Sequence, residues 1–223
     1  MRTLPKLGLC SRTQGYELIR SGQVTVNGAI VTDPDKKVSP TDRILINGKK
    51  TQKKLRYILL HKPAGYVTTR KDEKFRPTAY DILGDVGDWV FPVGRLDKET
   101  EGLLIFTNDT AFGDYLTNPV NKIPRRYVVT IEDAISEEEK RNIFNGVDIG
   151  RGEISRPTGL KVLEKNSRIS TIEITLTEGK NREIRRLFEK LGKEVKRLVR
   201  ISFGPFDLSD LAAGKWCEVS KRG

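Results

Sequence analysis

Apolar positions at helical and at alternating spacing predict a small N-terminal unit of one helix and short strands. The helix covers residues 12–21, with Ser11 placed to cap its start and a glycine directly after its end. Residues 23–31 alternate apolar and polar side chains around an Asn-Gly pair, which favours the positive φ angles of a tight hairpin. Residues 43–46 repeat the alternation before a second Asn-Gly pair. The pattern therefore predicts a domain over residues 1–48.

The remaining chain predicts many strands with few helices between them. A polar, basic linker over residues 49–54 leads into a second domain over residues 55–223. The expected strands are 56–61, 102–107, 126–132, 170–177, 195–203 and 216–220, and the expected helices are 110–116 (capped by Asn108), 137–145 (capped by Ser136) and 181–191. Because strands and helices do not alternate regularly, the pattern indicates an α+β fold instead of a doubly wound parallel sheet.

The distribution of charge along the chain indicates a type of binding partner. The chain has 41 Lys and Arg against 30 Asp and Glu, a net charge of +11. Residues 1–54 hold eleven basic and four acidic residues, and residues 180–200 hold nine basic and three acidic residues. Two compact basic clusters indicate a polyanion such as RNA, because each phosphate that Lys or Arg neutralises releases condensed counterions.

The residue inventory excludes several classes of protein. No apolar run approaches the ~20 residues of a membrane span, and the first ten residues lack the apolar stretch of a secretory signal, so we expect a cytoplasmic protein. Cys10 and Cys217 are too few for a disulfide framework, and with one histidine they offer no clustered zinc ligands. We expect that histidine, His61, to be an ordinary side chain at a strand end. Catalysis would then depend on carboxylates, tyrosines and basic side chains.

One polar loop stands out between two apolar segments, Gly94-Arg95-Leu96-Asp97-Lys98-Glu99-Thr100-Glu101-Gly102. Loops held between strands often carry functional residues. By spacing alone, however, Asp97 and Thr100 are better explained as a turn, because Asp and Thr side chains bond their own backbone.

The longer stretch 94–109 resembles the signature of the pseudouridine synthases of the RsuA/RluB/RluE/RluF family. Three more motifs complete the family's order. Lys62-Pro63-Ala64-Gly65 precedes this stretch, and Arg126-Tyr127-Val128-Val129 and Glu178-Gly179-Lys180-Asn181-Arg182-Glu183-Ile184-Arg185-Arg186 follow it. Residues 11–28 resemble an S-four-like RNA-binding domain, although only ten residues precede its Ser11-Arg12 pair, so we expect an abbreviated module. The resemblance implies a catalytic domain with a mainly antiparallel mixed sheet flanked by helices.

The resemblance also implies a reaction and a partner. Members of this family isomerise uridine in RNA: the N-glycosidic bond breaks, the base rotates, and it rejoins the sugar through carbon. Because no net redox occurs and no water is consumed, we expect neither a cofactor nor a metal. The implied substrate is ribosomal RNA, either free or in an assembly intermediate. Nothing in the sequence indicates an obligate protein partner, so we expect a monomer.

On this resemblance, Asp97 is the catalytic carboxylate. The sequence leaves open whether it adds to the sugar, adds to the base or first removes a proton from the sugar. A carboxylate in a site closed to water needs a cation to stay ionised, and we expect Arg185 to supply it, with Arg182 as the competing candidate. Tyr127 matches the tyrosine that stacks on the target base. Arg95 is expected to fill the gap that a flipped base leaves.

The remaining assignments concern RNA contact and the shape of the site. We expect Thr100 and Gly102 to shape the Asp97 loop, and Ile184 to provide an apolar wall. The expected RNA contacts are Arg12, Arg20, Lys62 (to a phosphate), Arg95 and Arg182.

Two other functions remain open at this level. A non-catalytic RNA-binding or ribosome-assembly protein could keep the same fold, but it would tolerate loss of Asp97, Tyr127 or Arg185, and all three are present. A carboxylate-based nuclease or glycosidase would need a second acid paired with Asp97. Glu99 and Glu101 are near in sequence, but no feature marks either as that partner.

Overall fold

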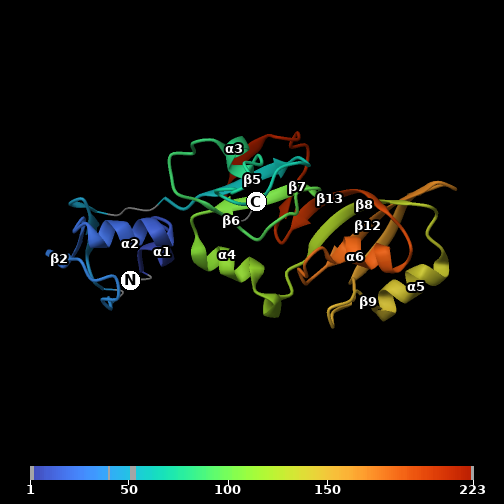
Figure 1. Ribbon diagram of the computed structural model, residues 1–223, viewed down its shortest axis with the longest axis horizontal. Helices are drawn as coiled ribbons and strands as arrows, with labels where there is room; N and C mark the ends of the chain where they lie inside the picture. Colours follow the sequence, from blue (N-terminus) through green and yellow to red (C-terminus); the bar gives the residue numbers. More distant parts are fainter. Residues whose placement is uncertain (1–2, 40, 51–53, 222–223) are drawn as a thin grey trace.

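Two main β-sheets organise the part of the chain that the computed structural model describes, residues 3–39, 41–50 and 54–221 (Figure 1). A four-stranded antiparallel sheet with two helices forms the N-terminal end, and a nine-stranded mixed sheet organises the rest. The α+β prediction, with a small domain before a large one, is confirmed. None of the described helices has the length and apolar character needed to cross a membrane.

The small sheet is formed by two hairpins that share a core with two short helices. In chain order its elements are α1 (Thr3–Lys6), α2 (Arg12–Arg20), β1 (Val24–Val26), β2 (Ala29–Val31), β3 (Ile44–Ile46) and β4 (Lys49–Lys50). Ser11 caps α2 as predicted, because its hydroxyl accepts a hydrogen bond from the Gln14 amide. Asn27 and Asn47 adopt positive φ angles at the two hairpins. Ile19 packs into the core between helix and sheet.

The small sheet extends further than the hydrophobic pattern predicts. Lys49 and Lys50 form β4 and pair with β3, so the first two residues of the expected linker belong to the sheet. Residues 51–53 of that linker lie outside the described residues.

The large sheet has the strand order β11-β12-β8-β13-β7-β5-β15, with β6 added beside β7 and β14 beside β13. Its strands are β5 (Tyr57–Lys62), β6 (Phe91–Pro92), β7 (Glu101–Thr107), β8 (Arg125–Glu132), β11 (Gly159–Lys165), β12 (Ile169–Leu176), β13 (Val195–Phe203), β14 (Phe206–Asp207) and β15 (Trp216–Val219). Among these strands, β13 and β7 pair in parallel and all other neighbours are antiparallel.

Helices cover both faces of this sheet. The remaining elements are α3 (Ala79–Leu83), α4 (Thr110–Thr117), the 3-10 helix η1 (Pro119–Asn121), α5 (Glu137–Asn145), α6 (Glu183–Lys190) and a small hairpin of β9 (Val147–Asp148) and β10 (Ile154–Ser155). Alternate residues of β5 and β7 pack with α4 on one face and with α3 on the other. Burial on both faces explains why these two strands are continuous apolar runs.

Two details differ from the sequence predictions. Asp109, and not Asn108, caps α4, because its carboxylate accepts the Phe112 amide. Asn108 instead uses its side chain to bond the backbone of Arg56 and Lys54. The predicted helix over 181–191 is shorter and begins at Glu183, because Arg182 adopts a left-handed conformation at its N-terminus.

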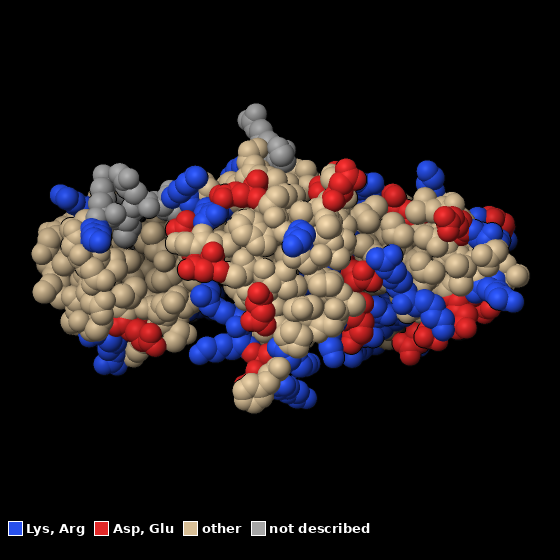
Figure 2. Space-filling model, turned by 90° about the horizontal axis from the view of Figure 1, so that it is seen from above, with Lys and Arg blue, Asp and Glu red and all other residues tan. Residues whose placement is uncertain are grey.

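Lys and Arg side chains lie along the lower edge of the molecule in the view of Figure 2, with acidic side chains between them. This edge includes both the small domain and the large one. A basic edge of that length can follow an RNA backbone across both domains.

Candidate active site

The loop that carries Asp97 is closed by its own backbone. The Thr100 amide donates to the Asp97 carbonyl at 3.1 Å, and the Thr100 side chain is buried beneath the turn. Gly94 starts the loop with a φ of +74°. The carboxylate of Asp97 stays about one-third exposed, at 35% of its full side-chain area, and faces a pocket. The turn therefore fixes the backbone while leaving the carboxylate accessible.

Gly102 lets the strand after Asp97 lie directly against β13. Its φ is +105°, which L side chains rarely adopt. A Cβ added here would lie 2.6 Å from the backbone nitrogen of Arg200 and closer still to its carbonyl oxygen. The residue assigned to loop shaping thus lies at the parallel pairing of β7 with β13.

Lys62 anchors this loop from below, which corrects the prediction that it contacts a phosphate. Its side chain is completely buried, and its ammonium donates to the carbonyls of Pro63, Tyr66 and Lys98. The Gly65 amide also donates to the Lys98 carbonyl, at 2.8 Å. Burial lowers the pKa of Lys62 to about 8. Since all three protons of the ammonium are used inside the protein, the group acts as a backbone anchor.

A pocket of about 480 Å³ brings together residues of three of the four sequence motifs. Asp97 lines it from the loop, Tyr127 from β8, and Ile184 and Arg185 from α6. Arg95 and Thr100 line it as well, and Arg182 lies at its rim. Segments far apart in sequence thus meet at the pocket that Asp97 lines, and Glu178 and Glu183 line it as well. By contrast, Arg12 and Arg20 lie on α2 in the small domain, outside this pocket.

Two arginines lie on the Asp97 side of the pocket with different contacts. Arg182 places a guanidinium nitrogen 4.0 Å from the Asp97 carboxylate and 3.2 Å from that of Glu99. Arg185 donates to the backbone carbonyls of Glu99 and Val195. Burial, followed by repulsion from Arg182, lowers the pKa of the Arg185 guanidinium. The geometry places Arg182 nearer to Asp97 and uses Arg185 to hold the loop that carries it.

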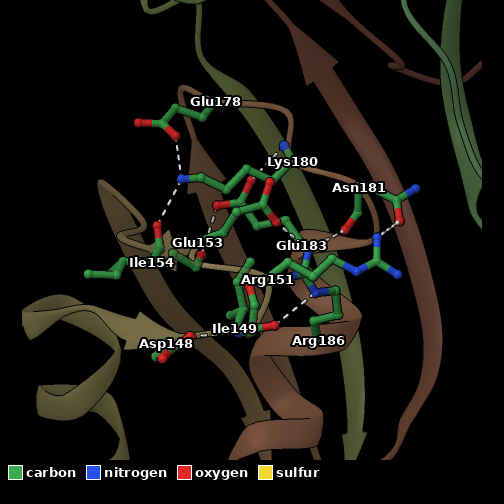
Figure 3. A network of polar contacts seen from close by, with 12 residues as sticks. Asp148, Ile149, Arg151, Glu153, Ile154, Glu178, Lys180, Asn181, Glu183 and Arg186 are labelled. Carbon is green, nitrogen blue, oxygen red and sulfur yellow. Dashed lines mark hydrogen bonds and ion pairs between the residues drawn. The ribbon is translucent and has the colours of Figure 1, made fainter.

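The segment that presents these arginines is tied to the β9–β10 hairpin by the network in Figure 3. Lys180 pairs with Glu178 and donates to the Ile154 carbonyl. The buried Glu183 carboxylate accepts from the Ser155 hydroxyl and the Lys180 amide. These bonds hold the turn before α6 in place.

Arg186 completes the same network from α6. It donates to the carbonyls of Ile149 and Gly150 and pairs with Glu153 at 2.5 Å. The Arg186 guanidinium therefore makes its hydrogen bonds within the protein, whereas Arg182 and Arg185 line the pocket.

Two further arginines, which the sequence analysis did not identify, line the pocket. Arg125 and Arg200 are both buried, and both guanidinium groups lie over the ring of Phe203. Among the described residues, one guanidinium nitrogen of Arg200 is buried without a hydrogen-bond partner. Arg125 was detectable from the sequence, because it lies two residues before Tyr127 and alternate residues of a strand share a face. Arg200 gave no comparable signal.

Ile184 and His61 are the remaining candidate positions. Ile184 belongs to the core beneath α6 as well as lining the pocket. His61 lies near the end of β5, where its Nδ1 is 2.6 Å from the Leu211 carbonyl oxygen. Within residues 3–39, 41–50 and 54–221, no group of three or more His, Cys, Asp or Glu side chains is arranged to hold a metal ion.

Comparison with known proteins matches this geometry to a family. Residues 56–190 match the family model of RNA pseudouridylate synthases, and residues 3–44 match that of the S4 domain. The chain is 35% identical over 222 residues to a Bacillus subtilis protein named ribosomal large subunit pseudouridine synthase B, a match that covers 98% of this chain and 91% of that protein. A Salmonella typhi protein of the same name is 34% identical over 228 residues, which cover 98% of this chain and 78% of that protein.

A solved structure extends the similarity to three dimensions. A crystal structure of a pseudouridylate synthase, 26% identical in sequence, superposes with a TM-score of 0.71 over 98% of this chain and 94% of its own. This chain belongs to the RNA pseudouridine synthase family and carries an N-terminal S4 domain. It is therefore an enzyme that acts on RNA, which decides against the non-catalytic alternative.

Proposed function

We propose that this enzyme converts a specific uridine of large-subunit ribosomal RNA to pseudouridine, with Asp97 as the catalytic carboxylate. The ribosomal substrate is supported by the names of the Bacillus subtilis and Salmonella typhi relatives. The observation that carries the assignment of Asp97 is its accessible carboxylate in a pocket shared with Tyr127 and Arg185. We propose that the enzyme works as a monomer and in the cytoplasm, where it would meet its substrate.

The chemistry follows from one carboxylate facing a ribose. In the sugar-attack scheme, an oxygen of Asp97 bonds to C1′ while the N-glycosidic electrons leave with the uracil, as in retaining glycosidases. The base then rotates, its C5 attacks C1′ and the carboxylate departs. C5 loses its proton to solvent and N1, which left with the glycosidic electron pair, gains one from solvent, so the product is an isomer of the substrate. Base attack and initial proton removal from C2′ would use the same carboxylate. Every scheme uses Asp97 as an ionised carboxylate.

The arginines of the pocket are proposed to have different roles. Arg185 is proposed as the fixed cation, because its bonds to the Glu99 and Val195 carbonyls hold it beside the Asp97 loop. Arg182 is more exposed and reaches both Asp97 and Glu99, which suits an RNA contact at the rim. Arg125 and Arg200 add positive charge on the β8–β13 side, where the unpartnered nitrogen of Arg200 suits an anionic oxygen.

The target base must leave its stack to reach this pocket, at a cost of about a few kcal/mol. Tyr127 is proposed to stack on the flipped base, since it lines the pocket and is only partly buried. Arg95 is exposed on the loop before Asp97 and is proposed to fill the vacated position in the RNA. The S4 domain, with Arg12 and Arg20 exposed on α2, would add phosphate contacts.

The substrate assignment is tested by mapping the product. Unmodified large-subunit ribosomal RNA, transcribed in vitro, is incubated with the protein and treated with a carbodiimide that blocks primer extension at pseudouridine. The proposal predicts one enzyme-dependent stop at a fixed uridine. Small-subunit ribosomal RNA and transfer RNA serve as controls. A stop only in a control RNA would overturn the large-subunit assignment, and a stop only in transfer RNA would overturn the ribosomal assignment altogether, but either would leave the chemistry of Asp97 intact.

A further inference from the structure

Phe75 is the most exposed large apolar side chain of the described residues, at 97% of its full area. It lies in the loop between β5 and α3, and its backbone φ is +53°. Bulky residues rarely adopt positive φ, and a glycine or asparagine would fit this backbone with less strain. Because the Phe75 ring is exposed, it does not contribute to the packing of the fold. The ring is therefore available for a binding role.

The tip of this loop is braced from within. The Asp72 carboxylate accepts from the amides of Lys74 and Arg76 and pairs with the Arg76 guanidinium at 2.6 Å. The Phe75 amide donates to the Asp72 carbonyl. The bonds to Arg76 hold the pKa of Asp72 well below its ordinary value, so the brace stays formed at neutral pH. The loop therefore presents Phe75 on a defined scaffold.

The base of the loop is attached to the active-site loop. The Thr68 hydroxyl donates to the Leu96 carbonyl at 2.9 Å and accepts from the Leu96 amide at 3.2 Å. Leu96 directly precedes Asp97. The Gly65 amide is bonded to the Lys98 carbonyl on the other side of Asp97. A contact at Phe75 thus has a fixed relation to the catalytic carboxylate.

The surroundings of Phe75 identify the kind of partner. Residues 69–77 carry four basic and two acidic residues, and Arg76 neutralises Asp72. The side chains of Lys71 and Lys74, which lie on either side of Asp72 in the sequence, are exposed. An exposed aromatic ring among cations is the combination with which proteins hold unpaired nucleotides, because the ring stacks on a base while the cations contact the backbone. A protein partner would also fit the ring, but the cations favour a polyanion.

We propose that Phe75 stacks on an unpaired base of the RNA substrate close to the target uridine. The inference rests on the RNA substrate of this enzyme but not on the role of Asp97. Stacking here would hold the strand beside the pocket while the target base is flipped.

Binding measurements on the full-length protein test the proposal. The probe is a fluorescently labelled transcript of large-subunit ribosomal RNA. Phe75→Asn keeps a residue that tolerates positive φ and removes the ring, and it should weaken affinity about ten-fold, as loss of one aromatic–base stack does. Because phenylalanine is uncharged, the slope of log affinity against log salt should not change. The thermal midpoint should not fall, since the side chain is exposed.

A matched control and a second readout separate stacking from other causes. Phe144→Asn makes the same change at a half-exposed phenylalanine of α5 and should leave RNA affinity unchanged. Phe75→Trp should keep wild-type affinity, and the emission it adds should be quenched by RNA but not by heparin, a polyanion without bases.

Three results would overturn the proposal. The first is wild-type RNA affinity in Phe75→Asn. The second is quenching of Phe75→Trp by heparin to the same degree as by RNA. The third is a change of oligomeric state in Phe75→Asn, seen by light scattering, with RNA affinity unchanged, which would assign Phe75 to a protein contact. If mapping finds no ribosomal product but Phe75→Asn still weakens binding, the ribosomal assignment fails and the stacking role stands.

Discussion

Gly102 and Arg200 meet backbone to backbone where β7 runs parallel to β13, and the space between them excludes a Cβ on Gly102. This contact joins the strand that begins just after Asp97 to the strand that carries the buried arginine of the pocket. The position of the Asp97 loop relative to Arg200 thus depends on one glycine.

Gly102→Ala should therefore destabilise the protein. The methyl group would meet the Arg200 backbone, and the φ of +105° adds strain for any L side chain. We expect a loss of about 2–4 kcal/mol in the free energy of unfolding, measured by urea denaturation. Gly192→Ala is the matched control, because Gly192 also has positive φ but has open space around it. Equal losses in both variants would show that the close approach contributes nothing.

The strand pattern predicted most of this fold, because alternation and Asn-Gly pairs act locally. It missed β11, whose residues are largely exposed at the sheet edge and give weak alternation. Three of the four motifs contribute residues to the pocket, but the contacts of each residue within it depend on the tertiary structure. From the sequence alone, Lys62 is predicted to be a cation free to contact a phosphate. The three carbonyls that its ammonium bonds are brought to it only by the fold. Arg200 was invisible because its partners come from β7 and from its own strand.

Lys62 makes the stability of the protein depend on pH. Its pKa is about 8 in the folded state and about 10.5 ordinarily, so between these values the unfolded chain binds more protons. This group therefore makes the free energy of unfolding rise with pH in that window. Lys62→Met should lack this rise when urea denaturation is repeated from pH 8 to pH 10.5. Parallel pH dependence in wild type and variant would contradict the burial of a charged ammonium.

The same variant distinguishes an anchor from a phosphate contact. Lys62→Met should lower the rate of pseudouridine formation at saturating RNA, because the Asp97 loop loses the bond from the ammonium to the Lys98 carbonyl. The salt dependence of RNA affinity should be unchanged. A shallower salt slope in Lys62→Met would reinstate the phosphate contact.

Arg12 and Arg20 should contribute to RNA affinity through charge alone. The double variant Arg12→Gln/Arg20→Gln should reduce the magnitude of the slope of log affinity against log salt by about 1.4–1.8, since two phosphate contacts are lost. Turnover at saturating RNA should stay close to wild type. Lys161→Gln/Lys165→Gln, which removes two exposed cations of β11, is the control and should leave the slope unchanged. An unchanged slope in the Arg12/Arg20 variant would remove α2 from the RNA interface.

The most direct test of the account is the activity of Asp97→Asn. The amide keeps the shape of the side chain and its place in the turn, but it removes the ionised oxygen that every scheme requires. Asp114→Asn, the same change on the exposed face of α4, is the control and should keep full activity. We predict that Asp97→Asn folds with an unchanged thermal midpoint, binds large-subunit ribosomal RNA as the wild type does, and forms no pseudouridine in a single-turnover assay. Pseudouridine formation above that of a mock preparation would contradict the assignment of Asp97 as the catalytic carboxylate.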